Sequence, residues 1–452
     1  MGYITYISRM RKYFLNFILL IAPVLAQSQV TLSNPYSYYG IGILANSSDP
    51  IQRALGNSSF AYTDSTMVNY YNSASHASGA KGYPLFSLSL NGQYSNVEDG
   101  GVTNTTQYFG LEHMYLSVPF AKRFGLAMGI NPYARRGYAF QRYTVVDGDS
   151  LRFEYEGKGN ISKAFVALSA NLIQRKNLVV AVGTNLGYLY GQVSNSRTSV
   201  FVGESKGGVA ITSERLRSFH YDVSASVRYN LNEKNNIHVS AYYDPSQKLR
   251  TSSTDDLYYF ETGSASNVLA SSDTSGRINS APALKLGLNY AQKFHRITKK
   301  NKEFDSELNY VVEYQNTAFT DFGFDYKPLN TPYTADFSRV SLGIQYTPNI
   351  DLYKNFGTTS IWNRMKYRVG AYSSSLPYQV GNTSYKEFGT TFGIGIPLVA
   401  QYSYSSLNLG FNIGKRSNTE PGAINESFVG FNVGIIISPS SADKWFRKVK
   451  LD

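Results

Sequence analysis

The chain has 452 residues, a formal net charge of +12 and no cysteine, and its aromatic residues include 38 Tyr but only 2 Trp. The lack of Cys excludes disulfides, thiolate metal sites, a cysteine nucleophile and a lipid-modified N-terminal cysteine. Abundant Tyr and Gly with only 16% charged residues is unusual for a soluble α/β enzyme, and it suits strands whose rings lie at a membrane–water boundary.

Residues 1–26 have the pattern of a secretory signal peptide. A basic start that ends at Lys12 precedes an apolar run from Phe14 to Ala26, and small residues favour cleavage before Gln27. The run is short for a spanning helix, and the alternative interpretation is a retained N-terminal anchor. No later stretch reaches 18 consecutive apolar residues, so a bilayer-spanning form of this chain must be a closed β-barrel.

Residues 27–82 are predicted to form an N-terminal hatch. The stretch 53–79 is long, lacks any strand alternation and precedes the first clear strand. A non-strand segment followed by strands to the end of the chain predicts a plug inserted in the lumen of a barrel.

Residues 83–438 are predicted to form the barrel itself, an all-β antiparallel transmembrane barrel of about fourteen strands. Apolar and polar residues alternate with period 2, and most segments reach the 9–11 residues that a tilted strand needs to cross a bilayer. The expected strands are 84–95, 107–119, 123–134, 160–173, 178–194, 217–230, 236–250, 278–293, 303–316, 336–348, 364–377, 386–398, 404–414 and 426–438. The basic tail 439–452 is predicted to lie in the periplasm.

The connections are predicted to alternate between short turns and long loops, as in outer-membrane barrels. The connection 349–363 is long but falls on the short-turn side, where we expect a small periplasmic element. The expected long loops are 95–106, 134–159, 195–216, 251–277, 317–335 and 415–425.

Charged residues within the strands lie on the polar side of the alternation, which predicts that the apolar rows face lipid and the charges face the lumen. We expect these charges to pair with one another or with hatch backbone; the alternative is a porin-like polar constriction. Glycines such as Gly393 are expected to pack against the hatch. The charges are Asp222, Arg228, Lys285, Asp305, Glu307, Glu313 and Arg339.

The stretch Arg53–Gly56, then Ala61, Asp64 and Asn69–Ala74, resembles the hatch of the FadL-type outer-membrane fatty-acid transporters. The residues 33–42 and the Trp-Phe tail are similar to related barrels of bacteria with type IX secretion. The resemblance implies ligand or hatch roles for Asp64, Asn69, Asn72, Ser73 and Ala74, although Ser73 stands where that family has Pro. From the residues alone, Asp64 and Asn72 are expected to cap turns.

No enzyme is predicted, because the five histidines lack metal-ligand spacing and there is no Gly-x-Ser-x-Gly elbow. We therefore expect no catalytic residue, metal or cofactor. The leading hypothesis, implied by the resemblance, is passive uptake of a small hydrophobic, fatty-acid-like molecule across the cell outer membrane. The alternative is a non-transport structural subunit of an outer-membrane secretion or assembly complex. Expected partners are outer-membrane lipid, a hydrophobic ligand or an outer-membrane protein, and not nucleic acid.

Overall fold

The computed structural model describes residues 34–79, 83–118, 121–261, 267–297, 303–326, 332–351, 359–398 and 404–439. The predicted signal peptide and nearly all of the predicted tail lie outside these residues. In chain order the elements are η1 (Pro35–Tyr38), β1 (Ile43–Leu44), α2 (Pro50–Arg53), η2 (Ser73–Ser78), β2 (Leu85–Asp99), β3 (Val102–Val118), β4 (Phe124–Val146), β5 (Asp149–Gln174), β6 (Leu178–Phe201), β7 (Lys206–Asn230), β8 (Asn235–Asp244), β9 (Lys248–Glu261), β10 (Asn267–Asn279), β11 (Ala283–Ile297), β12 (Glu303–Thr317), η3 (Phe319–Asp321), β13 (Gly323–Phe324), β14 (Phe337–Thr347), η5 (Ile361–Asn363), β15 (Lys366–Val380), β16 (Thr383–Pro397), β17 (Ser406–Ser417) and β18 (Asn425–Ile437).

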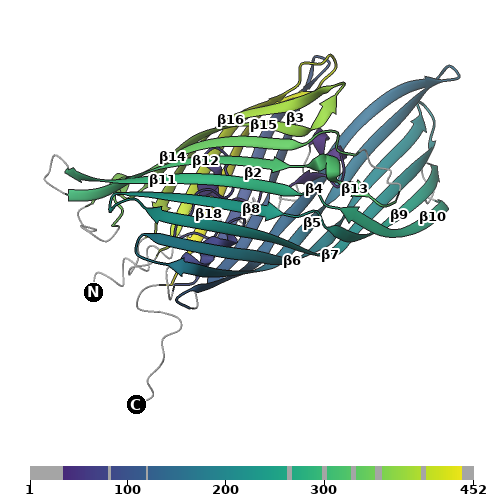
Figure 1. Cartoon of the computed structure of the whole chain (residues 1–452). Helices are drawn as coiled ribbons and strands as arrows, with labels where there is room; N and C mark the ends of the chain where they lie inside the picture. Colours follow the sequence, from purple (N-terminus) through teal and green to yellow (C-terminus); the bar gives the residue numbers. More distant parts are fainter. Residues whose placement is uncertain are drawn as a thin grey trace, which may run out of the picture.

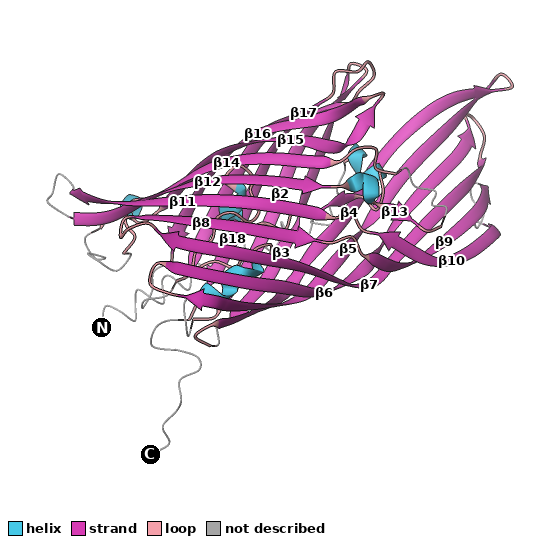
Figure 2. Ribbon diagram, in the orientation of Figure 1, coloured by secondary structure: helices cyan, strands magenta, loops and turns pink. Residues whose placement is uncertain are grey.

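The strands form one closed antiparallel barrel (Figures 1 and 2). β18 pairs with β2 from Asn425↔Glu98 to Ile437↔Phe86, and this pairing closes the sheet. β8 and β9 both pair with β7, one after the other, and together form one interrupted strand of the wall. β10 pairs with β9 and β11 pairs with β8, so β10 and β11 together form the next strand. β1 and β13 are two-residue bridges. The described wall therefore has fourteen strands, which confirms the predicted barrel.

The two faces of the wall differ as the alternation predicted. On β7, Phe219 is 82% exposed and the apolar residues after it on the same face are also exposed, whereas His220 and Asp222 are buried. The pattern repeats on β12, where Tyr310, Val312 and Tyr314 are exposed around the buried Glu313. Apolar rows on the outside and polar groups on the inside are the arrangement that a lipid-facing barrel requires.

One predicted inward charge, Asp305, is exposed. β14 pairs with β12 only as far as Glu307, and Asp305 lies beyond that point in a two-stranded extension of β11 and β12. On this extension the face that carries Phe304 and Ser306 is buried and the face that carries Asp305 is open, and Asp305 forms an ion pair with the half-exposed His295 at 3.1 Å. The alternation continues past the barrel, but the lumen does not.

Four of the segments that were predicted to be long loops form strands instead. The β2–β3, β4–β5, β6–β7 and β9–β10 hairpins occupy most of residues 95–106, 134–159, 195–216 and 251–277, in that order. The first two turn tightly at glycines with positive φ, Gly100, Gly101 and Gly148. The outer halves of strands β4–β7, β9 and β10 form a projecting sheet beyond the rim of the barrel, at the right of Figure 1. The described parts of 317–335 and 415–425 are mainly connections, and η5 lies in the described part of 349–363.

The wall is interrupted between β3 and β4. These strands pair only from Met114↔Ile130 to Val118↔Leu126, although both continue further. A register shift follows on β4 between Pro132 and Ala134, and a bulge of this kind bends a strand away from its neighbour. Beyond the bulge β4 pairs with β1 instead, through Arg135↔Ile43 and Ala134↔Leu44.

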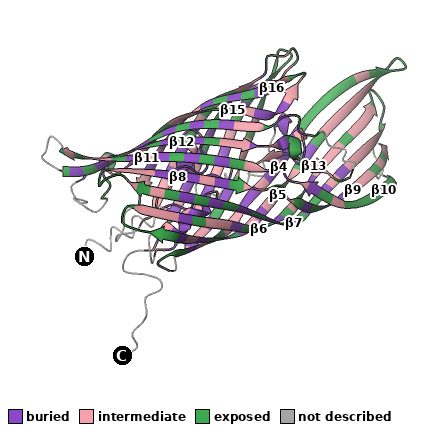
Figure 3. Ribbon diagram, in the orientation of Figure 1, coloured by how far each residue is buried: buried purple, intermediate pink, exposed green. Residues whose placement is uncertain are grey.

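Residues 34–79, called the N-terminal segment below, pack against inward-facing side chains of the strands. Most of the segment is buried, including Leu55, Phe60 and Asn72. Figure 3 shows buried residues at intervals along the strands of the wall. Its apolar residues form one core with inward residues of the wall such as Tyr115 and Phe165. Helices α2 and η2 are short, so wall contacts rather than helix propensity hold this segment in place.

Candidate functional site in the barrel lumen

Glu313 of β12 holds one turn of the N-terminal segment. Its carboxylate accepts hydrogen bonds from the backbone N–H groups of Ser59, Phe60 and Ala61 at 2.8–3.0 Å, and from the Ser59 hydroxyl at 2.7 Å. Successive N–H groups that converge on one carboxylate form a strong anion-binding turn. The ammonium of Lys285 also donates to the Ser59 hydroxyl at 2.6 Å.

Other strands hold the same segment from different sides of the barrel. On β7, Ser224 accepts from the Ala74 N–H at 2.9 Å and shares a hydrogen bond with the Ser73 hydroxyl at 2.8 Å. On β16, Thr391 accepts from the Gly56 N–H and donates to the Ala54 carbonyl. These bonds tie the segment to opposite parts of the wall.

Glycines of the wall allow the segment to lie directly on the strand backbone. A Cβ on Gly343 would approach Leu55 to 2.7 Å, one on Gly287 would approach Ala61 to 2.6 Å, and one on Gly393 would strike the Ala54 side chain. Only a residue without a side chain permits this approach. The expected packing role of Gly393 is confirmed.

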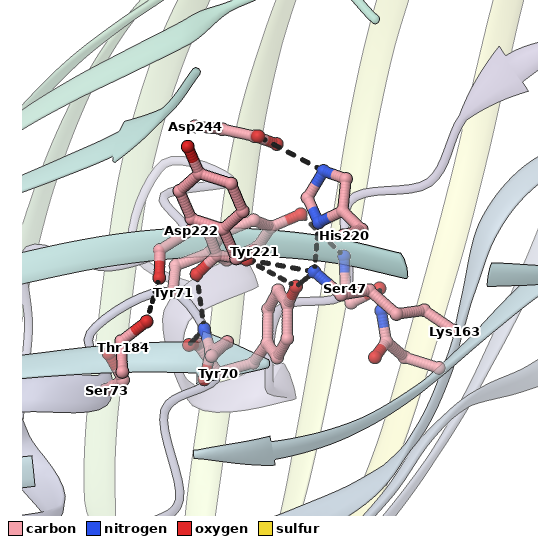
Figure 4. Close-up of polar contacts among 12 residues, drawn as sticks. Ser47, Tyr70, Tyr71, Ser73, Lys163, Thr184, His220, Tyr221, Asp222 and Asp244 are labelled. Atoms are coloured by element: carbon pink, nitrogen blue, oxygen red, sulfur yellow. Dashed lines mark hydrogen bonds and ion pairs between the residues drawn. The ribbon is translucent and has the colours of Figure 1, made fainter. Parts of the chain in front are cut away.

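A buried charge cluster on β5 and β7 holds the side chain of Tyr70 against the wall (Figure 4). The ammonium of Lys163 on β5 lies 2.9 Å from Asp222 and 2.8 Å from His220 Nδ1, and it also donates to the Tyr70 hydroxyl. Tyr70 in turn donates to Asp222 at 3.0 Å, and His220 Nε2 lies 3.1 Å from Asp244. Ions buried this deeply are stable only when each is paired and hydrogen-bonded, so the cluster holds Tyr70 rigidly.

A cavity of about 200 Å³ lies between the N-terminal segment and the wall, and its lining contains two kinds of side chain. The charged side chains are already engaged: Arg339 pairs with Glu387 at 3.5 Å, Arg416 pairs with Glu387 and Glu426, and Lys285 donates to Ser59. The others are apolar or aromatic, and they include Ile43, Leu44, Tyr133, Phe319, Phe337, Leu376 and Tyr378.

The interruption of the wall between β3 and β4 is bridged by charges. Glu112 of β3 is buried and accepts from Arg53 of the N-terminal segment at 2.6 Å and from Arg135 of β4 at 3.3 Å. Arg135 also donates to the Leu111 carbonyl at 2.7 Å. Two guanidinium groups and one carboxylate thus span the place where the strands lack ladder hydrogen bonds.

Four of the five site residues predicted in the hatch are held by the wall or by the segment itself, through hydrogen bonds. Asn69 donates to the carbonyls of Phe60 and Tyr62, Asn72 donates to Ser240 on β8 at 3.0 Å, and Ser73 and Ala74 contact Ser224 as above. The side chain of Asn72 does not cap η2. None of these residues is among those that line the described cavity.

Asp64, the fifth predicted residue, accepts from the Thr66 N–H at 3.1 Å, which is the expected turn cap. It also forms an ion pair with Lys366 of β15 at 2.8 Å. The ligand role that the resemblance implied for these five residues stays a prediction.

Among the inward charges, Asp222 and Glu313 are engaged as the sequence predicted: Asp222 pairs with Lys163, and Glu313 binds backbone of the N-terminal segment. Lys163 and His220 were missed. Lys163 lies between Ile161 and Phe165 on the inward face of β5, so the alternation contained the signal. Its partners come from sequence positions 57 and 59 residues away, and a single strand pattern does not reveal such pairing.

Metal sites and spanning helices are both absent from the part of the chain that the structure describes. That part contains no group of three His, Asp or Glu side chains placed to hold a metal ion. No helix within it is long and apolar enough to cross a membrane.

Solved structures share this fold. The toluene transporter TodX from Pseudomonas putida is 15% identical with a TM-score of 0.51, over 86% of this chain and 97% of that one. A TodX deletion mutant, described as a monoaromatic hydrocarbon channel, gives a TM-score of 0.55 at 14% identity, over 86% and 98% of the two chains. A Pseudomonas aeruginosa FadL homologue is 11% identical with a TM-score of 0.45, over 82% and 91%. The predicted resemblance to FadL-type barrels is confirmed.

No protein of curated function matches the sequence. The family model that matches covers residues 10–452 and is described as BamG. The chain belongs to the BamG family.

Proposed function

We propose that this protein is a non-transport barrel subunit of a larger assembly in the outer membrane, and that the N-terminal segment is a permanent plug. The observation that supports this best is the attachment of the segment to strands on all sides of the lumen, through Glu313, Ser224, Thr391 and the Lys163–Asp222 pair. A barrel that is sealed in this way offers its outer surface and its rims, and not a pore.

The energy needed to withdraw the plug supports this proposal. Moving the Ser59 turn away from Glu313 strips a buried carboxylate of its donors, and moving Tyr70 removes a partner of both Lys163 and Asp222. A buried polar group left without its partner costs roughly 1–3 kcal/mol, and more if it is charged. Opening both sites leaves Glu313, Lys163 and Asp222 short of partners, at a cost on the order of 3–9 kcal/mol, so the open state is populated less than about once in 10².

The outer-membrane location rests on the exposed apolar rows and on the predicted signal peptide. Rows such as Phe219, Tyr221 and Val223 on β7 are stable next to lipid, whereas in water they form a large apolar surface. The inward face is polar and filled by the plug. We assign no catalytic role, because the buried charges are engaged with one another or with the plug.

Uptake of a small hydrophobic, fatty-acid-like molecule is the second candidate function. It is favoured by the apolar and aromatic side chains that line the cavity. Three of them, Tyr133 and the β1 residues Ile43 and Leu44, lie at the place where β4 pairs with β1 instead of β3. The fold shared with TodX is consistent with this candidate. In this candidate, entry would be from outside and exit through the gap between β3 and β4.

Purification from native membranes in mild detergent separates the two candidates. A subunit of an assembly is expected to elute with at least one protein partner in fixed stoichiometry. A transporter is expected to elute alone, with a bound apolar molecule that mass spectrometry detects. Recovery of the chain with such a molecule and without any protein partner contradicts the structural role.

A further inference from the structure

One carboxylate in the lining of the lumenal cavity, that of Asp244, has no lysine or arginine paired with it among the described residues. Asp244 is the last residue of β8, its side chain is 14% exposed, and it lines the cavity described above. Its Oδ1 atom lies 3.1 Å from His220 Nε2 and accepts a hydrogen bond from the Gln247 side chain at 3.2 Å. The charge of Asp244 is therefore balanced only if the His220 ring carries two protons.

The contact between Lys163 and His220 shows that this ring carries one proton. An ammonium group only donates, and the Lys163 ammonium lies 2.8 Å from His220 Nδ1, so Nδ1 is the accepting nitrogen. The single ring proton is then on Nε2, the nitrogen that lies next to Asp244 (Figure 4). His220 thus orients the Asp244 carboxylate and leaves its charge uncompensated.

The other charges around the cavity do not compensate Asp244 either. Among the described residues, four cations line the cavity, and together with the groups that they contact they face five carboxylates. The pairings are Lys163 with Asp222, Lys285 with Glu313 through the Ser59 hydroxyl, and Arg339 and Arg416 with Glu387 and Glu426. Because the charges within these pairings are balanced, the one excess negative charge is that of Asp244.

Aromatic rings in the lining add a second attraction for a cation. The ring of Tyr133 lines the cavity and lies 5.7 Å from the ring of His220, the residue that contacts Asp244. The face of an aromatic ring attracts ammonium groups, and the lumen already contains one such contact, between the Lys285 ammonium and the Tyr71 ring at 3.3 Å. A carboxylate without a cation, close to an aromatic ring in a cavity, suits an organic ammonium ion.

We propose that this cavity binds a small organic cation, with its ammonium group at Asp244 and its apolar body against Tyr133 and the neighbouring apolar side chains. The volume of about 200 Å³ suits a molecule of monoaromatic size, since a cavity of roughly 150 Å³ accepts benzene. A carboxylate such as that of a fatty acid is disfavoured, because a cation of the lining would have to leave its present partner to bind it. The inference holds whether or not the ligand crosses the membrane, so it goes beyond both candidate functions.

Isothermal titration of the purified protein in a neutral detergent tests the site with three probes of similar size. Benzylammonium carries the cation, benzyl alcohol carries a neutral polar group and benzoate carries a carboxylate. We expect benzylammonium to bind roughly 10–100 times more tightly than benzyl alcohol, because one hydrogen bond between charged groups is worth about that factor. Benzoate should bind more weakly than either. Titration into detergent without protein corrects for partition of the probes into micelles.

Asp244→Asn removes the charge and keeps the shape of the side chain. It should weaken benzylammonium binding roughly 10–100-fold and leave benzyl alcohol binding nearly unchanged. The matched control is Asp305→Asn, which changes the net charge equally but lies on the exposed extension outside the lumen. Tyr133→Leu keeps an apolar side chain and removes the ring, so it should weaken benzylammonium binding severalfold more than benzyl alcohol binding. Heat-modifiable migration verifies the barrel in each variant.

Three results overturn the proposal. They are equal affinity of the parent protein for benzylammonium and benzyl alcohol, equal losses in Asp244→Asn and Asp305→Asn, and no binding of benzylammonium to the parent protein. No protein partner enters these titrations, so failure of the cation site leaves the proposed structural role standing, and failure of that role leaves the cation site standing.

Discussion

Removal of the Glu313 carboxylate should loosen the plug without destroying the barrel. In Glu313→Ala the N–H groups of Ser59, Phe60 and Ala61 and the Ser59 hydroxyl lose their common acceptor. Each buried donor left unsatisfied costs about 1–3 kcal/mol, and relaxation of the turn recovers part of this. We expect the plug to open more easily by about 3–5 kcal/mol in total.

A thiol at position 58 reports this opening. Ser58 is fully buried and Ser58→Cys is nearly isosteric, so in a chain without other cysteines a maleimide reacts only when the plug opens. Since about 1.4 kcal/mol corresponds to a factor of ten, labelling in the Glu313→Ala background should be roughly 10² to 4 × 10³ times faster. The control is Glu307→Ala on the same strand, because the Glu307 carboxylate accepts its hydrogen bond from Asn309 of that strand and not from the Ser59 turn.

Heat-modifiable migration establishes that both variants still form the barrel. If Glu313→Ala labels as slowly as the Ser58→Cys parent, the carboxylate does not hold the plug. Equal acceleration by Glu307→Ala would mean that labelling reports general destabilisation. Either result refutes the reasoning that the plug is held through Glu313.

Three further predictions concern the packing, a buried histidine and the outer face. Gly343→Ala should lower folding yield and stability by about 1–3 kcal/mol, because its Cβ would meet Leu55, whereas Gly208→Ala, with its nearest atom at 3.5 Å, should be tolerated in the same refolding assay. Burial lowers the pKa of His76 to about 4, so between pH 6.5 and pH 4 the unfolded chain binds a proton that the folded chain does not. The free energy of unfolding, followed by thermal melts, should therefore fall by about 2 kcal/mol between pH 7 and pH 5, and this loss should be absent in His76→Asn. Val223→Arg on the exposed face of β7 should cost up to about 2–4 kcal/mol on folding into lipid, and a fully soluble, stable variant would contradict the lipid-facing assignment.

The wall could be predicted from the sequence because successive residues of its strands face two different environments, the outer surface and the lumen, and their polarity alternates accordingly. On β7, apolar Phe219, Tyr221 and Val223 alternate with His220 and Asp222, and the exposed and buried positions follow that order. The projecting sheet could not be predicted, because its strands lack this difference between two faces. Residues such as Ser271, Ser272 and Thr274 on β10 are exposed on both faces, and a strand with water on both sides carries no alternation.

For the contacts in the lumen, the sequence predicted the type of interaction but not the residues that make it. An inward carboxylate such as Glu313 must find donors, and this much follows from the strand pattern. That its donors are Ser59, Phe60 and Ala61 depends on a contact between residues about 250 positions apart. The bend at Pro132 and the bridge between Arg53, Glu112 and Arg135 depend likewise on the three-dimensional path of the chain.

Hydrogen–deuterium exchange of the purified protein in detergent tests the central claim, that the plug is a fixed part of the barrel. The backbone N–H groups of Gly56, Ser59, Phe60, Ala61 and Ala74 bond to the wall or to Glu313, so they should exchange as slowly as those of the wall strands. Exchange of these amides within seconds, while the wall strands stay protected, would show a plug that opens freely and would contradict the account.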